Sequence, residues 1–342
     1  MFLNFREIQM HTVKRMFKPI HLVSMVFISL LVSWSPPQAL AQLNYPSKPI
    51  RIIVPLPPGS TLDVMARSIS YALGPNLGQA IVVENKIGAN GSIGMDACAK
   101  ASPDGYTLCL PDGNILTINP LAYEKLSYES QDFTPIIHIG DMEQSIVINS
   151  SVPAKNMKEF IEYAKSRPGQ VTWGSGGRGS TMHLYMEWIQ AKTGVSFNHI
   201  LYKGPADLSR ALTIGEVESS NLSTATVSPM VKEGKLKMIA VISGKQRSIH
   251  AGDATSFSDQ GFDLDFRNWL ALVGPKGLPP EIVKKWNLAV NGLLLDKAFT
   301  EKVLPSLAVT PAGGPSEDLV LQLERKKKLG QELAKIANLK AE

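Results

Sequence analysis

The stretch Val171-Thr-Trp-Gly-Ser-Gly-Gly-Arg-Gly-Ser-Thr-Met-His-Leu184 places four glycines within six residues, between a short apolar run and an amphipathic segment. The apolar start predicts the end of a buried strand, and so many glycines favour a tight turn with positive φ. Ser180 or Thr181 then supplies a helix N-cap, with apolar residues at helical spacing behind it. This arrangement favours an anion-binding site, because free N–H groups and the positive end of the helix dipole point the same way.

The same glycines match the dinucleotide fingerprint G-x-G-x-x-G at Gly174, Gly176 and Gly179. That motif requires an acidic residue at the end of the next strand, where the acid holds a ribose. The next predicted strand, residues 197–202, ends instead in Lys203-Gly204. The sequence therefore disfavours a nucleotide and leaves a small-anion site or a purely structural turn.

The N-terminus has the features of a secretory signal peptide. Three basic residues between positions 14 and 18 precede an uncharged apolar run over residues 20–34, and the small-x-small pattern Ala39-Leu-Ala41 follows. We expect residues 1–41 to be a signal peptide cleaved after Ala41, with Met1 or Met16 as the true start. The apolar run is short for a bilayer span, and an uncleaved membrane anchor is the alternative.

Charge and cysteine content bound the class of protein. Of the 35 basic and 30 acidic residues, four basic and one acidic lie in the predicted leader, which leaves 31 against 29 and a net charge of +2. So balanced a chain gives no support for a nucleic-acid partner.

Cys98 and Cys109 are expected late in a helix and on the strand after it. An oxidising compartment permits them to pair, so a disulfide and two buried thiols both stay open.

Apolar runs alternate with helical patterns along the chain, which predicts an α/β protein with parallel sheets covered by helices. A second strand, glycine turn and helix start occurs over residues 50–62, where Ser60 and Asp63 have capping-box spacing. We therefore expect Asp63 to cap and orient that helix. The predicted strands are 50–54, 79–83, 107–110, 133–139, 145–149, 171–173, 197–202, 217–222, 236–243 and 269–273. The predicted helices are 62–73, 93–101, 156–166, the segment after Ser180, 207–213, 229–232, 280–295, 298–304 and 316–336.

Two further loops follow predicted strands and carry polar side chains. Residues 111–115 are expected to form a loop with Asn114 as a polar contact, and Ser223, Thr224 and Ser228 to form a hydroxyl-rich loop. In parallel sheets, ligands bind outside the carboxyl ends of the strands. These side chains are therefore candidates for ligand contact.

The catalytic and metal-binding patterns that we searched for are missing. His138, His183, His199 and His250 follow the leader, and none has a second histidine four positions away. No C-x-x-C, G-x-S-x-G or P-loop pattern occurs. Ser180 and His183 leave a hydrolase as an alternative, although a helix N-terminus would lower the pKa of His183. A surface or cap histidine is the simpler interpretation, and we expect no enzyme activity, no cofactor and no metal.

A set of motifs runs in one order along the chain. It comprises Tyr45-Pro-Ser-Lys-Pro-Ile-Arg-Ile-Ile-Val-Pro55, Pro57-Pro-Gly-Ser-x-x-Asp63, Val82-Val-Glu-Asn-Lys86, Gly88-Ala-Asn-Gly-Ser-Ile-Gly94, Ser102-Pro-Asp-Gly-Tyr-Thr-Leu108, residues 173–181, Tyr202-Lys-Gly204, Gly234-Lys-Leu-Lys237 with Ala240-Val241, and Trp269 with Gly274-Pro-Lys-Gly-Leu-Pro279. These motifs resemble those of the substrate-binding proteins of tripartite tricarboxylate transporters, also called the Bug family. The resemblance covers essentially all of residues 44–330.

The resemblance implies the two-lobed, type II fold of periplasmic binding proteins, with each lobe a mostly parallel sheet flanked by helices. Lobe 1 would comprise residues 42–141 and 267–342, and lobe 2 residues 142–266, joined by crossover strands near 140–148 and 266–273. The implied function is a periplasmic receptor that captures a small carboxylate by hinge closure. It would deliver this ligand to the permease subunits of a membrane transporter. We expect a monomer.

In that family the carboxylate is held chiefly by backbone N–H groups and waters from one glycine loop on each lobe. These loops correspond here to residues 57–61 and 175–181. The candidate ligand-binding residues are Pro57, Gly59, Ser60, Thr61, Asn114, Ser175, Gly176, Arg178, Gly179, Ser180, Thr181, Ser223 and Thr224. Arg178 is a candidate for a charge-assisted contact with a second carboxylate, or it points to solvent.

Three positions depart from the family pattern. Ser60 stands where a second glycine is usual, Leu62 where Ser or Thr is common, and Glu218 where an aspartate is usual. The first loop is therefore less open than usual, and the ligand need not be the family's commonest. Two other functions stay open: an exported hydrolase that uses Ser180 and His183, and a receptor that passes its closed form to a signalling partner.

Overall fold

The structure is a computed structural model that describes residues 45–244 and 248–339. The predicted signal peptide, residues 1–41 with cleavage after Ala41, lies outside the described residues. The chain divides after Tyr45, and the unit that begins at Pro46 holds both sheets and the helices around them. Within the described ranges, no helix is both long and apolar enough to cross a membrane.

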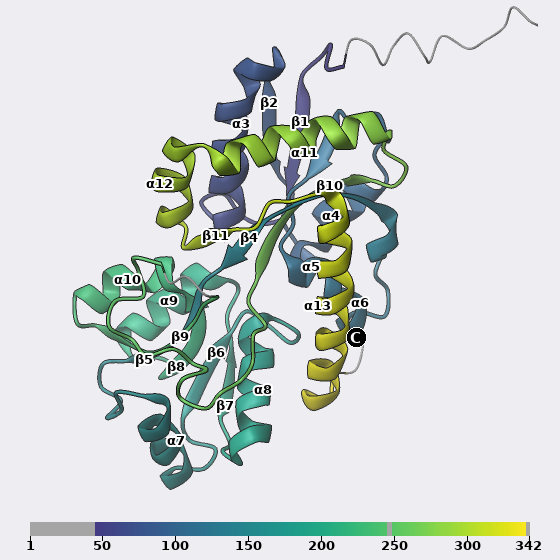
Figure 1. Ribbon diagram of the computed structural model, residues 1–342. Coiled ribbons are helices and arrows are strands. Elements are labelled where there is room, and N and C mark those ends of the chain that lie inside the picture. Colours follow the sequence, from purple (N-terminus) through teal and green to yellow (C-terminus); the bar gives the residue numbers. More distant parts are fainter. Residues whose placement is uncertain (1–44, 245–247, 340–342) are drawn as a thin grey trace, which may run out of the picture. The chain divides into compact units, whose positions relative to one another are not determined.

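Six strands form the first sheet, in the order β11-β4-β10-β3-β1-β2 (Figure 1). They are β1 (Ile50–Val54), β2 (Ile81–Asn85), β3 (Thr107–Cys109), β4 (Phe133–Met142), β10 (Trp269–Pro275) and β11 (Val309–Pro311). In β1 every residue except Arg51 is buried, as expected for a strand covered on both faces. β1 runs parallel to β2 and β3, whereas β10 is antiparallel to β3 and β4, and β11 is antiparallel to β4.

Helices from both ends of the chain surround the first sheet (Figure 1). They are α3 (Thr61–Leu77), η2 (Ala89–Gly91), α4 (Ser92–Ala99), α5 (Gly113–Thr117), α6 (Asn119–Ala122), η3 (Ser130–Asp132), α11 (Pro280–Leu295), α12 (Lys297–Ser306) and α13 (Ser316–Ile336). α3 packs against β2, and α11 against β4. α13 contacts β4 and also α8 of the second sheet, so the C-terminal helix touches both halves of the fold.

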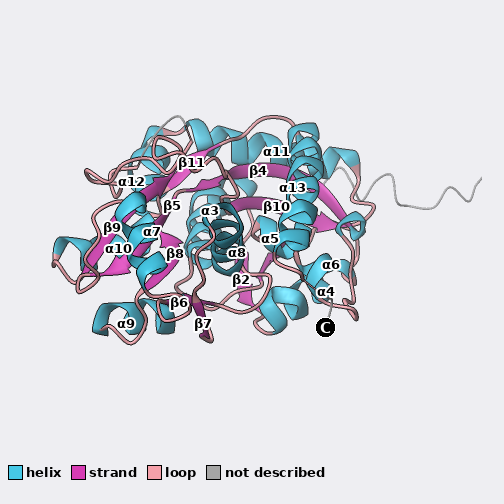
Figure 2. Ribbon diagram, turned by 90° about the horizontal axis from the view of Figure 1, so that it is seen from below, coloured by secondary structure: helices cyan, strands magenta, loops and turns pink. Residues whose placement is uncertain are grey.

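The second sheet has the order β7-β6-β8-β5-β9. Its strands are β5 (Gln144–Asn149), β6 (Thr172–Ser175), β7 (Asn198–Leu201), β8 (Ser219–Ser223) and β9 (Leu236–Ile242). The helices around it are α7 (Met157–Ser166), α8 (Thr181–Thr193), α9 (Pro205–Ile214) and α10 (Thr224–Lys232), which Figure 2 shows from below. One core includes Phe160 of α7 and Tyr185 of α8, and another includes Leu208 of α9 and Val227 of α10. The two cores cover the apolar strands with helices.

The prediction of an α/β fold with two helix-flanked sheets is confirmed, but neither sheet is mostly parallel. In the second sheet β6 is parallel to β7 and β8, whereas β5 is antiparallel to β8 and β9. The antiparallel pairs involve the strands on either side of the connections between the sheets. A chain that leaves one sheet for the other and later returns re-enters the first sheet in the opposite direction. The repeating β-α-β pattern of the sequence did not reveal this reversal.

The chain passes between the sheets at two places that lie side by side. It leaves the first sheet after Met142 and enters the second at Gln144, and it returns between Ile242 and Trp269. The N–H of Met142 donates to the carbonyl of Asn268, with an N···O distance of 2.8 Å. The lobe limits at 141/142 and 266/267 stay a prediction, for which these connections give support.

Three local predictions need correction. The expected loop over 111–115 contains the start of α5, which Asp112 caps by accepting from the N–H of Ile115 at 3.1 Å. Thr224 and Ser228 lie in α10 rather than in a loop. The glycine turn begins later than predicted, because Gly174 and Ser175 pair with β7 and so belong to β6. Glycine-rich or polar segments formed regular structure here because neighbouring strands or a cap completed their hydrogen bonds.

Cys98 and Cys109 form a disulfide, so the alternative of two free thiols is excluded. Cys98 lies on α4 and Cys109 on β3, with their Cα atoms 6.3 Å apart, and both side chains are fully buried. A helix packed on the strand that follows it brings the two residues within the range that a disulfide needs.

Candidate functional site

The second glycine loop connects β6 to α8 in the way that the sequence predicts. Ser180 is the N-cap of α8, because its Oγ accepts from the N–H of His183 at 3.3 Å. The same hydroxyl donates to the carbonyl of Gly177 at 2.7 Å. Gly177 and Gly179 have φ values of 121° and 76°, which only glycine adopts readily. These two glycines therefore allow the sharp turn into the helix.

Several amides of this loop are bonded inside the protein instead of pointing to a ligand. The N–H of Gly177 donates to Oγ of Ser175 at 3.1 Å, and the N–H of Gly179 donates to Nδ1 of His183 at 3.2 Å. The N–H of Ser180 donates to the carbonyl of Gly177 at 3.2 Å. A ligand in this region thus depends on side chains more than the sequence alone suggested.

The first glycine loop, between β1 and α3, is also internally bonded. Ser60 caps α3 by accepting from the N–H of Asp63 at 3.3 Å, and the Asp63 carboxylate accepts from the N–H of Gly59 at 2.9 Å. Asp63 is buried and also bonds Arg67 and Asn85. Burial alone would raise the pKa of Asp63, but these hydrogen bonds hold it below its ordinary value. Asp63 orients the helix, as the capping-box spacing predicts.

A chain of side chains connects the two sheets. Asn114 of α5 donates from Nδ2 to Oγ1 of Thr181, the first residue of α8, and Thr181 donates to Oδ1 of Asn268 at 3.1 Å. Asn114 and Thr181 are buried, with 8% and 3% of their surface exposed. The structure therefore brings two predicted contact residues together, bonded to each other. Asn268 lies within the expected crossover strand 266–273 and next to Trp269 of the motif set, but it was not among the predicted contact residues.

A cavity of about 190 Å³ lies where loops of the two sheets meet. From the second sheet it is lined by Gly176, Gly177, Arg178 and Leu201, and from the opposite side by Asn90, Ala122, Tyr123 and Leu339. Gly176 and Arg178 were predicted to contact ligand. Asn90 belongs to the Gly88–Gly94 turn, which the sequence marked without assigning a contact. The remaining lining residues, Ala122, Tyr123, Leu201 and Leu339, were not among the predicted contact residues.

The other predicted contact residues do not line this cavity. Thr224 donates from Oγ1 to the carboxylate of Glu143 at 2.9 Å, and Glu143 is buried and also accepts from the N–H of Ser248 at 2.9 Å. Oγ of Ser223 is buried and, among the described residues, has no hydrogen-bond partner. Pro57, Gly59, Ser60, Thr61, Asn114, Ser175, Gly179, Ser180 and Thr181 are likewise outside the lining. Their contact with ligand stays a prediction.

Two stacked histidines lie next to the second glycine loop. The rings of His183 and His199 are 4.8 Å apart, and Nε2 of His199 lies 2.6 Å from Oγ of Ser175. Burial, followed by the charges of His199 and Arg178, lowers the pKa of His183 to about 4. Burial and Arg178 also lower the pKa of His199. The lowered pKa of His183 has the predicted direction, but its cause is burial with the neighbouring His199 and Arg178 instead of the helix N-terminus. The interpretation as a surface histidine is wrong, since only 4% of His183 is exposed.

The arrangement of Ser180 and His183 does not favour the hydrolase. Nδ1 of His183 accepts from Gly179, and Nε2 lies 3.5 Å from the carboxylate of Glu187. Ser180 meets His183 through the backbone N–H of the histidine, as a helix cap does. To act as a general base, His183 would need a ring nitrogen within hydrogen-bond distance of the Ser180 hydroxyl. Among the described residues, no group of three His, Cys, Asp or Glu side chains is arranged to hold a metal.

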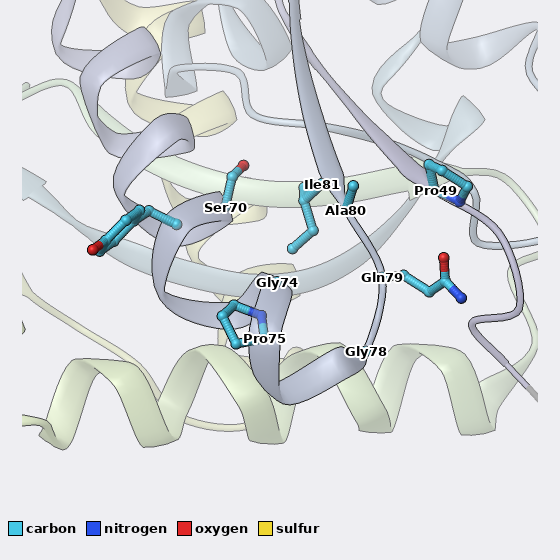
Figure 3. A pocket seen from close by; sticks show the side chains of 9 residues that line it. Pro49, Ser70, Gly74, Pro75, Gly78, Gln79, Ala80 and Ile81 are labelled. Atoms are coloured by element: carbon cyan, nitrogen blue, oxygen red, sulfur yellow. The ribbon is translucent and has the colours of Figure 1, made fainter.

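A larger hollow of about 590 Å³ lies on the opposite end of the first sheet (Figure 3). Ser70, Gly74 and Pro75 of α3 line it together with Ala80 and Ile81. None of its lining residues in the described chain carries a charge. It surrounds the C-terminus of α3, where the helix dipole is negative. This hollow is therefore a poor site for an anion.

Two helix-flanked sheets, joined twice and with a cavity lined from both, define the class of periplasmic binding proteins. The chain matches the model of the TctC family, the tripartite tricarboxylate transporter family receptors, over residues 65–334. It therefore belongs to this family, as the sequence motifs predicted.

Individual relatives agree with this assignment. The protein BugT of Bordetella pertussis is 34% identical over 261 residues, which are 75% of this chain and 80% of BugT. The structure of Rpa4515 of R. palustris with adipate is 29% identical, has a TM-score of 0.81, and covers 87% of this chain and 100% of that one. The periplasmic binding protein BugD is 29% identical, with a TM-score of 0.77 and the same coverage.

Proposed function

We propose that this protein is an exported receptor that captures a small carboxylate in the cavity beside Arg178 and delivers it to a tripartite tricarboxylate-type membrane transporter. The observation that carries the proposal is the cavity itself, lined by loops of both sheets and containing one cationic side chain. A site shared by two halves of a protein is suited to capture by closure.

Arg178 is the group best suited to hold the carboxylate. Its guanidinium presents a planar set of donors that matches a carboxylate in a bidentate way. It lies three residues before the start of α8, whose N-terminal dipole adds partial positive charge. The binding of adipate by the relative Rpa4515 supports a carboxylate as the ligand class.

Closure would couple binding to a change in shape. In the proposed division, residues 42–141 with 267–342 form one lobe and residues 142–266 the other. A ligand that contacts Arg178 on one lobe and Asn90 or Tyr123 on the other stabilises the closed form more than the open one. The bonds of Thr181 to Asn114 and Asn268 join the two proposed lobes beside the second glycine loop.

The remaining parts of the proposal concern location and partners. Residues 1–41 would direct export to the periplasm and be removed after Ala41. The receptor would act as a monomer and without catalysis, and its partners would be the permease subunits of the transporter. Membership of the receptor family supports this role.

The direct test is ligand-dependent unfolding of the chain from residue 42 onward. A carboxylate at 100 times its Kd should stabilise the folded protein by about 2.7 kcal/mol and raise Tm by several degrees. The ligand should be recovered chemically unchanged. Inorganic phosphate and uncharged amides of the same acids serve as ligand controls.

Arg178→Gln should weaken carboxylate binding about 10- to 100-fold, because a charge-assisted hydrogen bond is lost. Arg210→Gln is the matched control, since Arg210 is an exposed arginine outside the cavity. Calorimetric titration measures both variants. The proposal fails if no carboxylate changes Tm, or if Arg178→Gln binds as tightly as the unmodified protein.

A further inference from the structure

His199 contacts both the start of the second glycine loop, through Ser175, and helix α8, through His183. It lies on β7, opposite Trp173 of β6, and is half-buried. Its ring stacks on that of His183 with 4.8 Å between the centroids, and its Nε2 lies 2.6 Å from Oγ of Ser175. Histidine is the side chain whose ordinary pKa permits a change of charge between pH 5 and pH 8. The receptor function proposed above gives this titratable ring no role.

Ser175 connects the ring of His199 to the cavity wall. Its buried hydroxyl accepts from the N–H of Gly177 at 3.1 Å and donates to the carbonyl of Gly177 at 3.3 Å. Gly177 lines the cavity together with Gly176 and Arg178. A continuous path of hydrogen bonds therefore leads from a titratable ring to the loop that carries Arg178.

This path has an acceptor ready for a protonated His199. A hydroxyl has one hydrogen and two acceptor positions. While the hydrogen of Ser175 is on the Gly177 carbonyl, its Oγ accepts from the Gly177 N–H and has one position left for Nε2 of His199. A protonated imidazole donates from both nitrogens, and a charged donor makes the stronger hydrogen bond. Proton uptake by His199 would thus strengthen the contact that holds Ser175 on the loop.

The charges around His199 determine when it takes up a proton. Arg178 faces it from the loop, and α8 contributes His183 and Glu187, whose carboxylate lies 3.5 Å from Nε2 of His183. Burial, followed by the charge of Arg178, lowers the pKa of His199. Of the two stacked rings His183 is the harder to protonate, since burial and its neighbours lower its pKa to about 4. A carboxylate bound beside Arg178 would compensate the arginine charge and so favour a protonated His199.

We propose that His199 is a positioning residue that takes up a proton from solvent when a carboxylate binds beside Arg178, and that Ser175 transmits this change to Gly177. The proposal rests on the receptor function proposed above. Linkage makes the effect reciprocal, because a ligand that favours the protonated ring is in turn bound more tightly by it. Carboxylate affinity therefore rises as the pH falls below the ordinary histidine pKa of 6.5.

Calorimetric titration with adipate, malate and benzoate tests the proposal, and the acid that binds most tightly is then used as the probe. Titration at pH 6.5 in two buffers that differ in ionisation enthalpy gives the number of protons taken up on binding. The unmodified protein should take up protons, and its Kd should fall at least about threefold between pH 7.5 and pH 5.5. Binding without proton uptake would overturn the role of His199 and leave the receptor function standing. If none of the acids binds, both proposals fail.

His199→Asn keeps a polar side chain next to Ser175 but cannot take up a proton there. It should take up at least about twofold fewer protons on binding than the unmodified protein, and its Kd should change less with pH. This comparison also cancels the titration of the acid itself. His250→Asn is the matched control, because His250 lies against the carbonyl of Pro305 and outside the cavity. Equal proton uptake by His199→Asn and the unmodified protein would show that another group takes the proton.

Nuclear magnetic resonance of the histidine rings tests the proposal without any substitution. The ring signal of His199, recognised by its contact with the ring of His183, should titrate at a higher pH with saturating acid than without it. The signal of His250 should titrate at the same pH in both samples. A His199 signal that titrates at one pH with and without the acid would overturn the proposal.

Discussion

Gly179 donates its backbone N–H to the ring of His183, and this bond requires an unprotonated Nδ1. His183 meets the requirement because it is buried next to His199 and Arg178, which lower its pKa. At this scale, the neutral ring of His183 thus stabilises the second glycine loop through this hydrogen bond.

Protonation of His183 should make stability depend on pH. The folded pKa of about 4 lies below the ordinary 6.5, so between these values the unfolded chain binds a proton that the folded chain does not. Stability is therefore complete above about pH 6.5 and falls as the pH is lowered toward 4. His183→Asn keeps an acceptor near the position of Nδ1 and does not titrate. We expect its Tm to fall less between pH 7 and pH 5 than that of the unmodified protein.

His250→Asn is the control for this measurement, because His250 lies against the carbonyl of Pro305 and not against the glycine loop. The Tm of His250→Asn should depend on pH as steeply as the Tm of the unmodified protein. Equal slopes for all three proteins would show that His183 does not carry the pH dependence. His199, which also has a lowered pKa, leaves part of the slope in His183→Asn.

At the scale of elements, α4 and β3 are joined by the disulfide between Cys98 and Cys109. The element pair belongs to the core of the first sheet, with Met95 and Leu116 nearby in the same cluster. Neither cysteine lines the cavity. The disulfide should therefore act on stability and not on ligand binding.

Cys98→Ala with Cys109→Ala should destabilise the protein by about 3 kcal/mol, since the disulfide closes a loop of 11 residues in the unfolded chain. Urea unfolding with and without reductant measures the effect. Reductant should lower the stability of the unmodified protein and leave the double variant unchanged. A change in ligand affinity in the double variant would contradict the assignment of the disulfide to stability alone.

At the scale of the whole molecule, an ionic network built on the buried Arg267 and Lys326 lies at the return connection between the sheets. Arg267 is 9% exposed and bonds both carboxylate oxygens of Asp265 at 2.6 and 2.8 Å, with Asp141 at 3.7 Å. Lys326 of α13 donates to the carbonyl of Asp265 at 3.0 Å. Burial alone would raise the pKa of Asp141, but His138, Arg267 and Lys326 hold it below its ordinary value. The network therefore ties the connection to the C-terminal helix.

Arg267→Met should destabilise the protein by about 3 kcal/mol, because it leaves Asp141 partly buried with less compensation. Adding Asp141→Asn should restore part of the loss, as a double-mutant cycle measures. Small-angle X-ray scattering of the ligand-free Arg267→Met variant should show a broader distribution of molecular sizes than the unmodified protein. Additive effects of the two substitutions would contradict a coupled network.

Short-range patterns were predicted correctly where the residues concerned are neighbours in the chain. Ser60 and Ser180 cap their helices, and Pro280 begins α11. Prediction failed where the interacting residues are distant from each other in the sequence. The strand character of Gly174 depends on pairing with β7, and the wall formed by Tyr123 and Leu201 depends on two segments that meet only in space. No local pattern marks such residues.

The sequence by itself determined the α/β class, the two glycine turns with their helix caps, and the family, because these depend on local propensity and on motifs in order. Only the tertiary structure decided the mixed strand directions, the disulfide, and which amides are engaged inside the protein. It also decided where the cavity lies and that Arg178 shares it with apolar side chains. Those features arise from contacts between distant residues, whose hydrogen bonds and burial exist only once the chain has folded.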